Sequence, residues 1–245
     1  MREAAAMSIR TLFIRATLTA LFASHGAMLQ AASLQVAPVL VEVPTPAATS
    51  SLKLRNEGTK PLDAQIRIFR WTQVDGVDSL TPTEDVAASP PLASLRPSTD
   101  YTVRIVRTSK EPVVKEESYR LLIDELPAAA AGAPATVNIA LRYSIPVFFT
   151  VPSVAAPKLT WEVQQRANKL IIVVSNAGDR RIRLSKLRFT DGKGAVASFG
   201  EGLAGYVLAR SSRNFEVPAN AKGFGTGGVV SMSAQGDIGP IELKR

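Results

Sequence analysis

Ala64-Gln-Ile-Arg-Ile-Phe-Arg-Trp-Thr-Gln73 is the most regular run of alternating residues in the chain. Ile66 and Ile68 fall on one face of an extended backbone, and Phe69 and Trp71 fall on the other. Successive side chains of a strand point to opposite faces, so this period of two predicts a β-strand.

Similar short runs follow one another along the chain, separated by Gly, Pro, Asn and Asp. No run has a convincing helical period, and this spacing is typical of all-β sandwiches. We predict two immunoglobulin-like β-sandwich domains, residues 33–152 and 158–245, joined by a linker at 153–157. The predicted strands are Leu34–Val43, Ser51–Arg55, Ala64–Gln73, Thr102–Arg107, Ser118–Asp124, Thr136–Phe149, Leu159–Val163, Lys169–Ser175, Ile182–Thr190, Gly205–Leu208, Asn214–Val217 and Gly228–Ser233.

The composition argues against catalysis. The 245 residues include no cysteine and a single histidine, His25. Without these side chains there is no thiolate metal site, no cysteine nucleophile and no Ser-His-Asp triad. We therefore expect no enzyme, no catalytic residue, no metal and no cofactor. The net charge is +8, but the basic residues occur singly along strands, so we expect no nucleic acid partner.

Residues 1–32 have the pattern of a secretory signal peptide. Arg2, Arg10 and Arg15 precede and border an apolar run, and Gln30-Ala31-Ala32 offers small residues for cleavage. The run is shorter than the ~20 residues that a membrane-spanning helix needs. We expect an exported protein without stable membrane insertion, and His25 is removed with the signal.

The predicted strand Thr136–Phe149 is unusually long, and one of its faces is apolar over most of that length. That face carries Val137, Ile139, Leu141, Tyr143 and Ile145. An exposed apolar edge strand invites pairing with another chain. The alternation by itself leaves two interpretations open: an interior strand that packs its own core, or an edge strand offered to a partner.

Several motifs resemble the periplasmic pilus chaperones of the chaperone–usher (PapD-like) family, in the same order along the chain. The sequences of these motifs are most similar to those of the archaic, Csu-type branch, which is associated with spore-coat-U-like pilins. The motifs are Asn56-Glu-Gly58 with Pro61-Leu62, Phe69-Arg-Trp71, Ser89-Pro-Pro91, Leu95-Arg-Pro97, Glu117–Pro127 and Ile139–Phe149, with weaker similarity at Ser175–Gly178 and Gln235–Gly239.

The resemblance implies a function and a set of partners. A chaperone of this family stabilises pilin subunits by donor-strand complementation, in a 1:1 complex, and delivers them to an outer-membrane usher. It implies an L-shaped arrangement of the two domains and a location in the Gram-negative periplasm. The donor residues would be the five apolar residues named above, and the free protein would be able to cap its own donor strand by dimerising.

The resemblance also raises a question about anion binding. Pro38 and Pro146 stand where the family has two basic residues that hold the subunit's C-terminal carboxylate. The substitute candidates are Arg120 first, then Arg104 and Arg142. For Arg120 the alternatives are a solvated strand arginine or a partner of Asp124. The family's interdomain arginine would fall at Thr150, so its usual bridge to an acidic residue such as Asp237 is in doubt.

Two other functions compete with the chaperone. The first is a secreted structural pilin or adhesin subunit, although such subunits usually carry a disulfide and an incomplete sandwich. The second is a periplasmic hydrolase, which the missing histidine disfavours. We expect Trp71 and Trp161 to fill the cores of the two domains rather than to bind a sugar.

Overall fold

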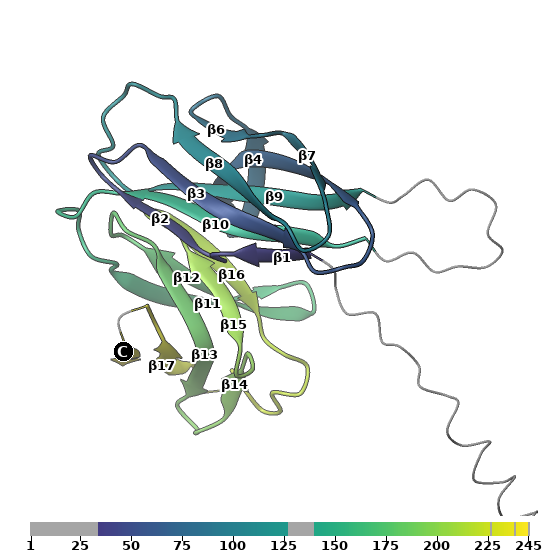
Figure 1. Ribbon diagram of the computed structural model, residues 1–245. Coiled ribbons are helices and arrows are strands. Elements are labelled where there is room, and N and C mark those ends of the chain that lie inside the picture. Colours follow the sequence, from purple (N-terminus) through teal and green to yellow (C-terminus); the bar gives the residue numbers. More distant parts are fainter. Residues whose placement is uncertain (1–33, 127–139, 226, 238, 245) are drawn as a thin grey trace, which may run out of the picture. The chain divides into compact units, whose positions relative to one another are not determined.

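A computed structural model describes residues 34–126, 140–225, 227–237 and 239–244, and Figure 1 shows its strands. The first ten strands form two sheets with the orders β1-β3-β8-β6 and β2-β10-β9-β4-β5, and β7 also pairs with β4. Their bounds are β1 (Leu34–Ala37), β2 (Val41–Pro44), β3 (Thr49–Asn56), β4 (Leu62–Val74), β5 (Val77–Pro82), β6 (Val86–Ser89), β7 (Leu92–Leu95), β8 (Asp100–Arg107), β9 (Glu117–Leu126) and β10 (Arg142–Thr150).

The core of this first sandwich comes from the alternation seen in the sequence. Ile66 is 2% exposed and Ile68 packs against the same cluster, whereas their neighbours on β4 face the other way. Leu121 and Ile123 of β9 meet them across the sheet, at positions paired with Ile68 and Ile66. Burying these side chains supplies the main driving force for folding this sandwich.

The chain changes sheets near its first proline. β1 pairs with β3 in one sheet, and β2, which starts at Val41, pairs in parallel with β10 in the other. Pro38 lies between β1 and β2, and a proline at this position indicates an edge strand or a point where the chain switches from one sheet to the other. This switch decides which part of β10 has a neighbour on its second side.

The remaining strands form a second sandwich with its own core, which includes Trp161, Phe189 and Phe215. Its sheets have the orders β11-β12-β16 and β14-β13-β17-β18, with β15 also paired to β13. The bounds are β11 (Leu159–Arg166), β12 (Lys169–Asn176), β13 (Ile182–Asp191), β14 (Val196–Ser198), β15 (Leu203–Val207), β16 (Ser211–Glu216), β17 (Val229–Gln235) and β18 (Pro240–Lys244).

In each sandwich, the side chain of a buried asparagine closes a turn through the same two hydrogen bonds. The Asn56 side chain donates to the carbonyl of Lys60 and accepts from the amide of Gly58. Asn176 does the same with Arg180 and Gly178. Both asparagines are at most 3% exposed, and their hydrogen bonds satisfy polar groups that burial would otherwise leave unpaired.

The all-β prediction with two immunoglobulin-like sandwiches is confirmed, since the described residues form strands and no helix. Accordingly, no helix among them is long and apolar enough to cross a bilayer. In the same residues no group of three His, Cys, Asp or Glu side chains is placed to hold a metal ion. The proposed signal peptide and residues 136–139 of the predicted donor segment lie outside the described residues, and the domain boundaries remain a prediction.

Candidate functional site

The site is built around β10, whose two halves have different surroundings (Figure 1). From Arg142 to Phe149, β10 pairs antiparallel with β9. On its other side it pairs with β2, but only from Val147 to Thr150. Across the described chain, residues 142–146 therefore have a strand on one side only.

The hydrogen-bond pattern shows which groups this open edge presents. Glu125 donates its amide to the carbonyl of Leu141 at 2.9 Å, in register with the pairing of β9 and β10. Alternate residues of an antiparallel strand point their polar groups to opposite sides. The amides and carbonyls of Arg142 and Ser144 thus point away from β9. On that same side, Thr150 accepts the amide of Thr45.

Proline ends the open edge. Pro146 has the same parity as Arg142 and Ser144, and it has no amide hydrogen. The parallel pairing with β2 begins at the next residue, Val147. The open edge thus offers two amides and two carbonyls, those of Arg142 and Ser144, before β2 takes over the second side of the strand.

The predicted donor residues are placed as follows. Val137 and Ile139 lie outside the described residues. Leu141 comes just before β10, and its amide donates to the Glu125 carboxylate at 3.3 Å. Tyr143 donates its hydroxyl to the carbonyl of Leu34, and Ile145 is 4% exposed in the core of the first sandwich. The side chains of Tyr143 and Ile145 thus fill their own sandwich.

Arg120 lies on β9, paired with Pro146 of β10, so its side chain is beside the end of the open edge. Its guanidinium carbon is 3.7 Å from the centre of the Trp71 ring, and one N–H donates to the carbonyl of Ser144 at 3.4 Å. Burial lowers the pKa of Arg120 from its ordinary value, and Asp78 acts in the opposite direction. Of the described carboxylates, none lies within 4.0 Å of this guanidinium.

The other two candidate arginines have different surroundings. Arg142 forms an ion pair with Asp124, and Arg67 binds the second oxygen of the same carboxylate at 2.7 Å. Asp124 is therefore not a partner of Arg120. Burial alone raises the pKa of Asp124, but these two arginines outweigh it and hold that pKa below the ordinary value. Arg104 is exposed on β8, in the other sheet.

The expectation that Trp71 fills the core of the first sandwich is wrong. Trp71 is 2% exposed, but it belongs to a separate cluster with Phe148, Tyr206 and Leu208. Residues of both sandwiches contribute to this cluster, and sequence periodicity assigns a face to a residue without saying what covers that face. Trp161 does lie in the core of the second sandwich, as predicted.

A buried ion network that none of the sequence-based predictions includes lies next to this cluster, with Arg181 over the ring of Phe148. Arg181 of the second sandwich donates to Glu116, at 2.6 Å, and to Glu42. The side chains of Arg181 and Glu116 are 2% and 0% exposed. Asp237 pairs instead with Arg183 in its own sandwich. Buried charges occur almost only in pairs, but Glu116 and Arg181 are 65 residues apart, so no local pattern links them.

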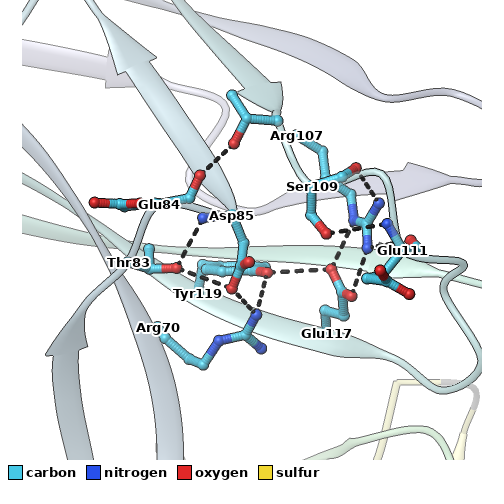
Figure 2. A network of polar contacts seen from close by, with 10 residues as sticks. Arg70, Thr83, Glu84, Asp85, Arg107, Ser109, Glu111, Glu117 and Tyr119 are labelled. Atoms are coloured by element: carbon cyan, nitrogen blue, oxygen red, sulfur yellow. Dashed lines mark hydrogen bonds and ion pairs between the residues drawn. The ribbon is translucent and has the colours of Figure 1, made fainter.

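A second polar network fixes the start of β9 (Figure 2). The buried Tyr119 hydroxyl accepts from Arg70 at 2.8 Å and lies 3.1 Å from Glu117, to which it donates. Arg107 binds both oxygens of Glu117, and Arg70 also binds Asp85. These contacts hold β9 in place at Tyr119, the residue directly before Arg120. They therefore help to set the position of that arginine.

The comparison with protein-family models decides the family. The model of the pili and flagellar-assembly chaperone family, PapD N-terminal domain, matches residues 33–155. The chain belongs to this family. The family predicted from the motifs is confirmed, and because its members are non-enzymatic chaperones, so is the prediction that the protein is not an enzyme. A comparison with curated protein sequences gives no match.

Solved structures of pilus chaperones have the same fold. A chain of the CsuC–CsuE chaperone–tip adhesion subunit pre-assembly complex, from the archaic chaperone–usher Csu pili of Acinetobacter baumannii, is 24% identical with a TM-score of 0.69. The alignment covers 86% of this chain and 98% of that one. For the E. coli chaperone DraB the values are 22%, 0.56, 87% and 98%. For the Salmonella enterica SafA pilin–SafB chaperone complex they are 19%, 0.60, 87% and 96%.

Proposed function

We propose that this protein is a periplasmic chaperone that binds pilin subunits by donor-strand complementation and delivers them to an outer-membrane usher. The observation that carries the proposal is the open edge of β10 at residues 142–146, in a chain of the pilus chaperone family. Two of the similar solved structures are described as complexes of a chaperone with a tip subunit or a pilin.

The open edge supplies main-chain hydrogen bonds for a partner strand. An incomplete immunoglobulin-like subunit lacks one strand, and the amides and carbonyls of Arg142 and Ser144 are available to pair with its exposed strand. Val137, Ile139 and Leu141 precede this edge in the sequence, at alternate positions that share the parity of Tyr143 rather than that of Arg142 and Ser144. We propose that their side chains fill the subunit's open groove, each contributing about 1.5–3 kcal/mol of burial energy, less the cost of association.

We further propose that Arg120 binds the C-terminal carboxylate of the subunit. Its support is a half-buried guanidinium beside Pro146 that is not paired with a described carboxylate. Beyond Pro146 the edge is taken by β2, so a terminal strand that ends at Arg120 has to approach along residues 142–144. Such a strand runs in the same direction as β10, as β2 does.

Delivery then needs no nucleotide. A subunit held open by a borrowed strand retains folding free energy, and we propose that the extension of the next subunit displaces β10 at the usher and releases it. In the free state, we expect a second copy of the chain to cover the same edge, because an unpaired strand edge invites association.

Co-expression with candidate pilins tests the proposal against its rival. A chaperone gives a soluble 1:1 heterodimer, whereas a structural pilin gives polymers and a hydrolase gives neither. The sharper test is Arg120→Ala. We expect this variant to keep its fold and lose stable subunit capture, because a desolvated carboxylate needs a charged donor. Arg104→Ala is the matched control, since Arg104 lies exposed in the other sheet. Capture that survives Arg120→Ala unchanged contradicts the anchor.

A further inference from the structure

The Arg120 guanidinium lies over an aromatic ring, and among the described residues its N–H groups make a single hydrogen bond. At 3.7 Å from the centre of the Trp71 ring, the guanidinium carbon is in van der Waals contact with the face of the indole, and Tyr206 lies further away at 5.7 Å. A planar guanidinium that stacks on an aromatic face keeps its N–H groups in its own plane. Of the five N–H groups, one makes a long hydrogen bond to Ser144, at 3.4 Å.

Trp71 is itself fixed from several sides. Its indole N–H donates to Asp78 at 3.0 Å. Its ring packs at a tilt against Phe148, with centroids 5.9 Å apart, and edge-on against Tyr206, at 5.5 Å. With 2% of its surface exposed, the indole is enclosed by these neighbours.

Asp78, the carboxylate whose charge acts most strongly on Arg120, already has other hydrogen-bond partners. Asp78 accepts hydrogen bonds from Trp71, from Gln73 at 2.9 Å and from Arg213, with which it forms an ion pair. Its field favours the charged form of Arg120 without a direct bond between the two side chains. The aromatic ring nearest to the Arg120 guanidinium is that of Trp71, and no described carboxylate binds this guanidinium directly.

We propose that Trp71 is a positioning residue: its indole holds the Arg120 guanidinium flat beside the end of β10, with its N–H edge ready to bind a carboxylate in the bidentate manner. This inference rests on the proposed function of Arg120 and adds a specific role for Trp71. Stacking restricts the flexible arginine side chain before the ligand arrives, which lowers the entropic cost of forming two parallel hydrogen bonds. The cation–π attraction also offsets the loss of water around the charge.

A purely structural role predicts something different. In that case Arg120 only covers the indole, and changes at Trp71 alter stability without altering how the folded protein binds a carboxylate. The two roles are separated by the environment of the Arg120 side chain and by its affinity for a simple carboxylate, both measured on the folded mature chain.

The experiment follows the arginine Nε–Hε signals by NMR while acetate is added, with chloride at equal ionic strength as the reference. Arg120→Lys assigns the signal. We expect Hε of Arg120 to be displaced upfield by the indole ring current, and acetate to shift this signal. In Trp71→Leu we expect the upfield displacement to vanish and the acetate midpoint to rise about fivefold, as loss of a partly desolvated cation–π contact predicts.

Two further variants complete the design. Trp71→Phe keeps an aromatic face, so it should retain part of the displacement and of the affinity even if Trp71→Leu folds poorly. Trp161→Phe removes indole from the other core and should leave the Arg120 signal and the acetate midpoint unchanged. An Arg120 signal at its ordinary position, no response of it to acetate, or the same midpoint in Trp71→Leu overturns the inference.

Failure of the proposed function has a separate signature. If Arg120→Ala still captures pilin subunits, the anchor itself is wrong. If Arg120→Ala loses capture but Trp71→Leu captures and binds acetate like the native protein, the anchor stands and the positioning role of Trp71 is overturned.

Discussion

The Arg181 guanidinium lies 3.6 Å from the centre of the Phe148 ring. Phe148 belongs to β10, whereas Arg181 precedes β13 of the second sandwich. The same arginine donates to Glu116 and to Glu42 of β2. One residue of the second sandwich thus contacts β10, β2 and the segment before β9, on the side where β2 closes the edge of β10.

Removing Arg181 should destabilise the protein strongly. We expect Arg181→Ala to lower the free energy of unfolding by about 3–5 kcal/mol, because it leaves the buried Glu116 carboxylate without a cation. Burial already raises the pKa of Glu116, with Arg181 opposing it, so removing Arg181 should raise this pKa further. Urea unfolding at several pH values measures both effects.

A matched surface pair provides the control for Arg181. Arg210 and Asp179 also form an ion pair, at 2.7 Å, but the arginine side chain is 55% exposed. Arg210→Ala should cost far less stability than Arg181→Ala, because solvent screens an exposed pair. Equal losses of unfolding free energy in Arg181→Ala and Arg210→Ala would contradict the claim that burial makes the Arg181 ion pair important for stability.

The hydroxyl of Tyr119 should contribute to stability beyond the packing of its ring. It accepts from Arg70 and donates to Glu117 in a site with 0% exposure (Figure 2). Tyr119→Phe keeps the ring but leaves both partners one hydrogen bond short, so we expect a loss of about 1–3 kcal/mol. Tyr101→Phe is the control, because the Tyr101 hydroxyl is bonded at an exposed position; a similar loss there contradicts this prediction. Thermal unfolding compares the two.

Gly76 should not tolerate a side chain. Its φ is +78°, and an added Cβ would lie 2.2 Å from the Asn214 side-chain oxygen. Gly194 has a similar φ of +82° but open space around it. Both Gly→Ala changes carry backbone strain of about 1–3 kcal/mol, so the extra loss in Gly76→Ala measures the clash with Asn214. Combining Gly76→Ala with Asn214→Ala should recover that extra loss; if it does not, the clash is not its cause.

Asp124 should make stability depend on pH in the acid range. Arg142 and Arg67 hold its pKa below the ordinary value in the folded state. Its contribution is therefore fully present above the unfolded pKa, about 3.9, and is lost as the pH falls through the folded pKa. We expect Asp124→Asn to cost about 1 kcal/mol at pH 7, since both arginines are partly exposed, and almost nothing at the lowest pH. A difference that stays constant from pH 7 to pH 2 would speak against this assignment.

The amide of Ser144 should matter for partner binding and little for folding. It points away from β9, so Ser144→Pro removes it without breaking the ladder between β9 and β10. We expect subunit capture to weaken about tenfold or more, since the partner loses a main-chain hydrogen bond and meets the proline ring. Ser144→Ala keeps the amide and should capture normally in the same pull-down. Equal capture by the two variants argues against pairing at this edge.

Much of the architecture was readable in the sequence because alternation is a local property. The strand at 64–73, the sheet switch near Pro38 and the family motifs all lie within short windows of the chain. The side chains of Ile66 and Ile68 also fall on the buried face, as their spacing predicts. The candidate site was only partly readable: the sequence ranks Arg120 before Arg104 and Arg142, but it does not show that Arg142 pairs with Asp124 while Arg120 lies on the ring of Trp71.

The sequence by itself determined the strand pattern, the pilus chaperone family and the absence of cysteine chemistry, since each depends on residue type and short spacing. Only the tertiary structure decided that the pairing of β2 with β10 begins at the residue after Pro146, that Asp124 engages Arg142, and that Arg120 lies on the ring of Trp71. These relationships join strands that pair across long stretches of chain. Their partners are chosen by sheet order and burial, and neither is encoded in the spacing of neighbouring residues.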